Sequence, residues 1–244
     1  METKFWKTTS GGLAILAVGL IATALIAGWF YLRGKSYDHT LSVTGSAKME
    51  VEADTAKWSF DIVRKVTFAN QKLGYAAIDK DIETTKAFLE QSGIPKENIT
   101  VAPAEFYVDY DKQQIAGAEP EYRLSARVTV HSSDVAALTG IAEKVSELVG
   151  SGVFISNTNL QYYYSKLAEA RVTLSGEAVK DAKQRAQSIA AASGDTVGPL
   201  QSVSGGVIQV LAPNSTDVSD YGTYDTSTIH KVISFSVRAA FTIR

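Results

Sequence analysis

The segment from Gly11 to Leu32, GGLAILAVGLIATALIAGWFYL, restricts the fold more than any other, because its 22 residues carry no charge. At about 1.5 Å per residue, a helix of this length reaches roughly 33 Å, enough to cross a hydrocarbon core of about 30 Å. Aromatic residues close the run and basic residues come directly after it, as is typical of a membrane interface. We therefore predict a membrane-spanning helix whose apolar surface includes Leu13, Leu16, Leu20, Ile26, Trp29 and Phe30.

A cleaved signal peptide is the alternative interpretation of this segment. Lys4 and Lys7 would form its basic start, and Ala22-Thr23-Ala24 would supply the small residues of a cleavage site. The apolar run continues for eight residues beyond Ala24. An uncleaved anchor is therefore favoured, since a signal peptide ends soon after its short apolar region.

The charges beside the segment do not fix its orientation, because basic residues lie on both sides of it. An N-terminal signal anchor most often exports the domain on its C-terminal side. We therefore expect residues 1–36 to form a cytoplasmic tail and a membrane anchor, and residues 37–244 to form an extracytoplasmic domain.

Composition excludes several classes of function. Lys and Arg number 24 and Asp and Glu 26, so no nucleic-acid partner is expected, since such binders normally present a basic surface. Cysteine is absent, which excludes disulfides, thiolate nucleophiles and cysteine-ligated zinc. The partners predicted are the lipid bilayer, through residues 11–32, and further copies of the chain, and the sequence identifies no other protein partner.

Hydrophobic periodicity predicts the secondary structure of the remainder. Apolar alternation indicates strands near residues 41–47, 56–68, 99–110, 121–131, 153–164, 197–211 and 229–243. Helical spacing indicates helices at residues 71–91, from Ser132 or Ser133 to 150, and at 166–192. The predicted fold class is α+β: a transmembrane helix, then mixed, largely antiparallel sheets with three packed helices.

Two of these elements have distinctive apolar faces. The helix at 166–192 has a narrow, alanine-rich stripe, comprising Leu167, Leu174, Ala178, Ala182, Ala186 and Ile189. The strand at 229–243 places Lys231 as the only charge on an otherwise apolar face.

No nucleophile elbow, phosphate loop, dinucleotide fingerprint or zinc-protease motif is present. The three histidines, His39, His131 and His230, lie at predicted strand ends, where their imidazoles could converge on a metal. Exposed histidines without a metal are the simpler interpretation. Asp217, Asp220 and Asp225 lack the order of a calcium loop. Asp109 and Asp111 have no partner base, and a turn is the favoured interpretation. No catalytic residue, cofactor or metal site is predicted.

Tyrosines gather at predicted strand ends and loops. Because exposed tyrosines bury a large area while keeping a polar tip, they are favoured at protein interfaces. The alternative is the ordinary preference of tyrosine for strands. The candidate oligomer interface comprises Tyr107, Tyr110, Tyr162, Tyr163, Tyr164, Tyr221 and Tyr224.

Four stretches together resemble the SIMPL-domain family, whose bacterial members include a periplasmic immunogenic protein. They are LSVTGSAKMEVEADTAKWSFDI, SGIPKENITVAPAEFYVDY, AVKDAKQRAQSIAAASGDTVGPLQSVS and ISFSVRAAFTIR. Where the family usually has Pro-Asp after the first strand, this chain has Ala53-Asp54. The resemblance implies a location in a bacterial inner (plasma) membrane, with residues 37–244 exported to the periplasm or the cell exterior. It also implies assembly into large ring- or channel-like homo-oligomers and a part in envelope or oxidative-stress defence. It brings no catalytic residues.

Three functions are compatible with these features. The first is an anchored, non-enzymatic scaffold that self-assembles through sheet edges and tyrosine-rich strand ends. The second is a module that binds a small molecule, lipid or peptide, and the third is an enzyme of unfamiliar type. We favour the scaffold.

Overall fold

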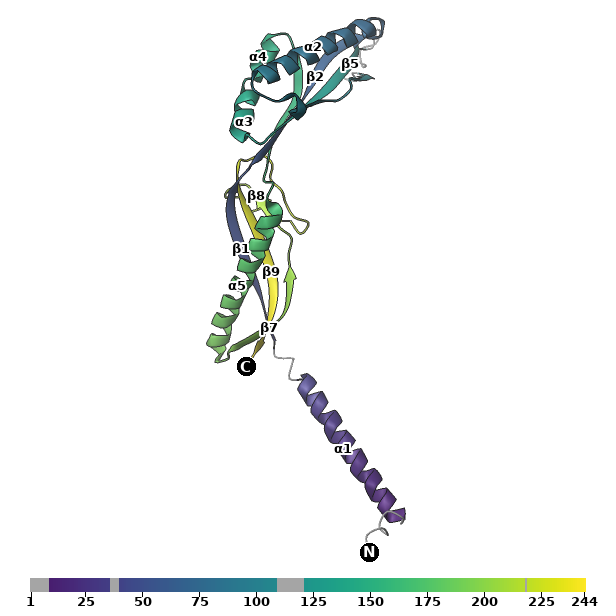
Figure 1. Cartoon of the computed structure of the whole chain (residues 1–244), viewed down its shortest axis with the longest axis vertical. Helices are drawn as coiled ribbons and strands as arrows, with labels where there is room; N and C mark the ends of the chain where they lie inside the picture. The colour runs from purple at the N-terminus through teal and green to yellow at the C-terminus, as the bar shows by residue number, and fades with distance from the viewer. Residues whose placement is uncertain (1–8, 36–39, 109–120, 218) are drawn as a thin grey trace, which may run out of the picture. The chain divides into compact units, whose positions relative to one another are not determined.

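The computed structural model describes residues 9–35, 40–108, 121–217 and 219–244. The described residues confirm the α+β class: an N-terminal apolar helix precedes two sheets and further helices (Figure 1). The chain divides into two compact units, whose boundaries fall within β1, α5 and β9 and between β7 and β8. The first unit consists of residues 1–47, 175–206 and 236–244, and the second of residues 48–174 and 207–235.

The elements come one after another in a simple order. The helices are α1 (Thr9–Lys35), α2 (Gln71–Gln91), α3 (Val135–Glu143), α4 (Val145–Gly150) and α5 (Leu167–Ser193). The strands before α5 are β1 (Thr40–Glu52), β2 (Thr55–Thr67), β3 (Ile99–Val101), β4 (Glu105–Val108), β5 (Glu121–Ser132) and β6 (Ile155–Tyr163). The strands after it are β7 (Val197–Gly205), β8 (Gln209–Leu211) and β9 (His230–Ile243).

The second unit is built on a five-stranded sheet in the order β3-β5-β2-β6, with β4 also paired to β5. β2 and β5 are antiparallel partners along their whole length, from Ala56 opposite Ser132 to Thr67 opposite Glu121. One face of these strands carries apolar side chains and is covered by α2 and α3 (Figure 1). Its largest buried side chains include Trp58, Phe60, Ile62, Ile78, Leu89, Leu124 and Leu138.

The first unit packs α5 against a sheet in the order β1-β9-β7. The contact is close because Gly45 has no side chain: a Cβ atom there would lie 2.1 Å from the Ala178 carbonyl oxygen and 2.4 Å from the Ala182 nitrogen. The alanine stripe is confirmed from Leu174 to Ala186, all 0% exposed. Leu167, at the start of the predicted stripe, is only partly buried. The prediction is wrong for Ile189, which is 49% exposed, and Ala190 is buried instead.

Three predicted elements are interrupted. The helix expected up to residue 150 divides at Lys144, whose backbone (φ −86°, ψ 12°) leaves the helical region, so the described chain has two helices there. The strand expected at 99–110 is β3 and β4, separated at Pro103, which has no N–H for a ladder. The strand expected at 197–211 is β7 and β8.

Candidate functional site

The apolar helix α1 has the dimensions of a membrane span. Residues Gly12–Leu32 form the one helix in the described chain that is long and apolar enough to cross a bilayer. Its six predicted lipid-facing side chains, Leu13, Leu16, Leu20, Ile26, Trp29 and Phe30, are each more than half exposed to solvent. A surface apolar all round suits lipid contact, and a signal sequence would share these properties.

At the β1 edge of the first unit's sheet, one backbone donor is bonded to a side chain of α5. The backbone N–H of Ser46 donates to the Asp181 carboxylate at 2.8 Å, and the Arg185 Nε also donates to it at 2.8 Å. The pKa of Asp181 is lowered, mainly by the Ser46 hydrogen bond. Burial raises this pKa, and Arg185 lowers it further. A backbone donor that a neighbouring strand would need is therefore already used.

The opposite edge of this sheet is formed by β7, where the backbone groups have a different arrangement. Gly206, just beyond β7, donates its N–H to the Ser236 carbonyl oxygen at 2.8 Å, and Gly205 and Val203 lie opposite Val237 and Ala239. Because antiparallel pairs alternate, the backbone N–H and C=O groups of Val203 and Gly205 point away from β9, toward the open edge. No charged residue lies in Val197–Gly205, and Leu200 and Val203 are 46% and 44% exposed. This edge lacks the charged side chains with which many proteins block strand addition.

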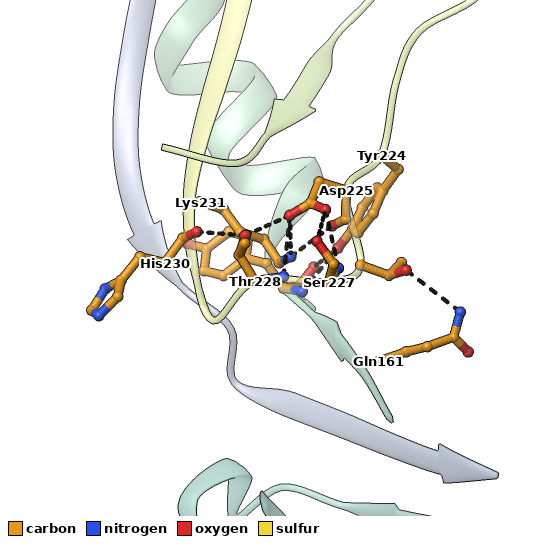
Figure 2. A network of polar contacts seen from close by, with 9 residues as sticks. Gln161, Tyr224, Asp225, Ser227, Thr228, His230 and Lys231 are labelled. Carbon is orange, nitrogen blue, oxygen red and sulfur yellow. Dashed lines mark hydrogen bonds and ion pairs between the residues drawn. The ribbon is translucent and has the colours of Figure 1, made fainter. Parts of the chain in front are cut away.

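A buried polar network organises the loop before β9 in the second unit (Figure 2). Lys231 is 1% exposed, and its Nζ donates to the Asp225 carbonyl oxygen at 2.6 Å and lies 3.6 Å from the Asp225 Oδ2. The Asp225 carboxylate also accepts the backbone N–H and hydroxyl of Ser227 at 3.0 and 2.7 Å, and the hydroxyl of Thr228. The one charge predicted on the apolar face of β9 is thus paired within its own loop.

Electrostatics in this network favour the charged carboxylate. Burial raises the pKa of Asp225, but the hydrogen bonds from Ser227 and Thr228 and the charge of Lys231 outweigh it and bring the pKa to about 2. Burial lowers the pKa of Lys231, and Asp225 partly opposes that shift.

Backbone hydrogen bonds attach the same loop to the sheet. The N–H of Tyr162 donates to the Thr226 carbonyl oxygen at 2.8 Å, and that of Ala53 donates to the Ile229 carbonyl oxygen at 2.9 Å. The network therefore holds the end of β6 and the β1–β2 turn in place. We interpret the network as structural, because the contacts that it makes connect separate parts of the chain to one another.

The structure separates the predicted tyrosines into different environments. Tyr162 is 8% exposed and its hydroxyl lies 3.1 Å from that of Thr139, which places it in the core. The Tyr163 and Tyr224 rings lie 5.9 Å apart, and the Tyr224 hydroxyl accepts the N–H of Tyr164 at 2.9 Å. Tyr107, Tyr221 and Tyr224 are exposed, Tyr221 by 96%. Tyr110 lies outside the described residues.

The remaining polar candidates do not converge in the described chain. His230 is an exposed residue 3.4 Å from Glu52, and His131 lies on β5, opposite Lys57. Asp217 and Asp220 are exposed, unlike Asp225. No group of three or more His, Asp or Glu side chains that could hold a metal occurs among the described residues. His39, Asp109 and Asp111 lie outside them.

Comparison with known proteins agrees with this architecture. A family model described as SIMPL, a protein of unknown function (DUF541), matches residues 41–239. The chain belongs to the SIMPL family. The match begins in β1 and ends in β9, so the SIMPL region covers both sheets and leaves α1 outside it. No curated protein matches the chain.

Proposed function

We propose that this SIMPL protein is a membrane-anchored, non-enzymatic scaffold that works outside the cytoplasm and assembles with copies of itself through the open edge of β7. The observation that carries the proposal is the difference between the two edges of one sheet. The Ser46 N–H at the β1 edge is bonded to Asp181, whereas Val203 and Gly205 direct their backbone groups outward at the β7 edge.

Chemistry at the β7 edge favours a second copy as its partner. An uncharged strand can pair with itself without like-charge repulsion. The half-exposed side chains of Leu200 and Val203 would be buried by the added strand. The exposed Tyr224, whose ring lies 5.9 Å from that of Tyr163, provides a further surface of the kind found at interfaces.

Membrane attachment would strengthen such assembly. Copies that share one bilayer are held at a high effective concentration, so a weak edge contact suffices for a stable ring or larger array. A supporting role in the cell envelope, including defence against stress, is part of the same proposal.

The test is the mass of the detergent-solubilised full chain, measured by light scattering after gel filtration. We expect a species far above the 26.2 kDa of one chain. Val203→Pro should reduce it to the monomer, because proline removes an N–H that points outward while the β9 ladder keeps its own bonds. Val203→Thr, which keeps the N–H and the branched side chain, should assemble as the wild type does.

Two results would contradict the proposal. One is a wild-type protein that is monomeric in several mild detergents. The other is a Val203→Pro variant that has the wild-type circular dichroism spectrum and assembles fully.

A further inference from the structure

The second unit has a polar recess on the face of its sheet opposite α2 and α3. The recess has a volume of about 490 Å³ and is lined by Asp61, Ala102, Pro103, Glu105, Tyr107, Ser125, Arg127 and Asn157. These residues come from β2, β4, β5, β6 and the β3–β4 connection, so paired strands form its floor.

Asp61 is the fixed centre of the recess. Because it alternates with the core residues Phe60 and Ile62, it faces the side of β2 away from the core. Even so, it is only 6% exposed. Arg127 donates to its carboxylate from Nε at 2.8 Å and from Nη2 at 3.1 Å, and the Asn157 amide donates at 2.8 Å. The hydrogen bond from Arg127 is the main cause of a lowered pKa of Asp61.

The position of Asn157 costs conformational energy. Its φ of 49° lies in the left-handed region, which non-glycine residues adopt infrequently. It occupies an irregularity in the β2–β6 pairing, where Ser59 is opposite Asn159 and Asp61 is opposite Ser156. Bulges and strained residues are found often beside binding sites, because they redirect a side chain. Here the redirected amide reaches Asp61 and lines the recess.

Arg127 extends from the buried carboxylate to solvent. Its side chain is 61% exposed, and the Nη1 group has no hydrogen-bond partner among the described residues. Rigid donors held by a buried acid are the groups that orient a polar ligand. Ser125 and the Tyr107 hydroxyl add groups that both donate and accept.

Charge and shape select the class of ligand. The charged side chains lining the recess are Arg127, Asp61 and Glu105, a net charge of about −1, which disfavours an anion. The floor is a paired sheet face, so a peptide cannot bind there by adding a strand. An aromatic ring beside several donors and acceptors suits a sugar, whose C–H face packs on the ring while its hydroxyls form hydrogen bonds.

We propose that the recess binds a neutral oligosaccharide, with the Tyr107 ring against one sugar face and the Ser125, Arg127 and Asn157 side chains bonded to its hydroxyls. The recess lies wholly within the second unit and does not involve β7, so this proposal is independent of the assembly proposal.

Saturation-transfer NMR on the detergent-solubilised full chain tests the binding proposal. The probes are maltotetraose, cellotetraose and tetra-N-acetylchitotetraose, each up to about 10 mM, so that millimolar dissociation constants are detected. We expect at least one probe to bind. Tyr107→Ala should weaken its binding about fivefold or more by removing the ring contact. Tyr107→Phe, which keeps the ring, should retain most of the affinity.

Two further variants separate binding from folding. Asn157→Gly accepts the positive φ but lacks the amide, so it should fold and bind more weakly. Tyr221→Ala removes an exposed tyrosine outside the recess and should bind as the wild type does. The proposal fails if no probe binds, if Tyr107→Ala binds normally, or if Tyr221→Ala loses as much affinity. It also fails if Tyr107→Ala lowers the assembled mass, since that places Tyr107 in the self-association interface.

Discussion

At the scale of single residues, the second unit contains two acids whose charges are fixed by dense hydrogen bonding. Asp61 is held by Arg127 and Asn157, and Asp225 by Ser227, Thr228 and Lys231. Both acids have a pKa below the ordinary value, so each is more acidic in the folded chain than in the unfolded chain. The charged form of each therefore stabilises the fold.

Asp225 gives a pH dependence of defined sign. Its pKa falls from 3.8 to about 2 on folding, so its contribution of about 2 kcal/mol is complete above about pH 5 and is lost as the pH falls toward 2. In Asp225→Asn this contribution is absent at every pH. We therefore expect the difference in unfolding free energy between the wild type and the variant, measured by urea denaturation, to shrink between pH 4 and pH 2.

Asp220→Asn serves as the control, because Asp220 is exposed in the same loop. Its unfolding free energy should stay within about 0.5 kcal/mol of the wild type across the range. A constant difference between Asp225→Asn and the wild type down to pH 2 would contradict the assignment.

At the scale of elements, the packing of α5 depends on one glycine. A Cβ at Gly45 would overlap the backbone of α5 at Ala178 and Ala182, and backbone atoms cannot move aside as a flexible side chain can. Gly45→Val should therefore destabilise the fold by about 3 kcal/mol or more, measured as a fall in the thermal midpoint. Normal stability in this variant would show that α5 is not packed as described.

A glycine on α5 itself provides the control substitution for Gly45→Val. A Cβ at Gly176 meets no atom within 4 Å. Gly176→Ala should raise the stability by about 0.5–1 kcal/mol, because alanine has the higher helix propensity.

The sequence predicts the faces of these elements better than their ends. Alternation in β5 correctly identifies Leu124, Ala126, Val128 and Val130 as buried, because one strand face meets the core. The break at Lys144 escapes prediction because apolar spacing continues across it into Leu148. The interruption at Pro103 had a local signal, the missing N–H.

The candidate sites were harder to predict than the elements, because they depend on partners brought together by folding. Lys231 was recognisable as a charge on an apolar face, but its partner lies in a loop without periodicity. The sequence gives no signal for Asp61, because it lies on the outward face of a strand, where polar residues are ordinary. Its partners Arg127 and Asn157 are also distant from it in sequence. The bond that the Ser46 N–H makes at the sheet edge depends on Asp181 of α5, and no strand pattern contains that residue.

At the scale of the whole molecule, the absence of cysteine permits a direct test of topology. Tyr221 is 96% exposed, so Tyr221→Cys introduces a single accessible thiol. If the SIMPL region is exported, a membrane-impermeant maleimide should label this variant in intact spheroplasts. Lys4→Cys, before the apolar helix, should be labelled only after lysis.

Labelling of Lys4→Cys and not Tyr221→Cys in intact spheroplasts would reverse the proposed orientation. Recovery of the Tyr221→Cys protein in the soluble fraction, without residues 1–24, would identify α1 as a cleaved signal sequence.

The burial of Trp58 makes the second unit optically distinguishable. The chain has three tryptophans, Trp6, Trp29 and Trp58, and Trp58 is the one that lies beyond the apolar helix. Its indole is 1% exposed, tilted against Phe60 at 4.5 Å and bonded through Nε1 to the Thr158 hydroxyl. A red shift of its emission therefore reports loosening of the second unit's core, while the sheet of the first unit contributes no indole signal. Fluorescence and circular dichroism recorded on one sample would thus show whether the two units melt together.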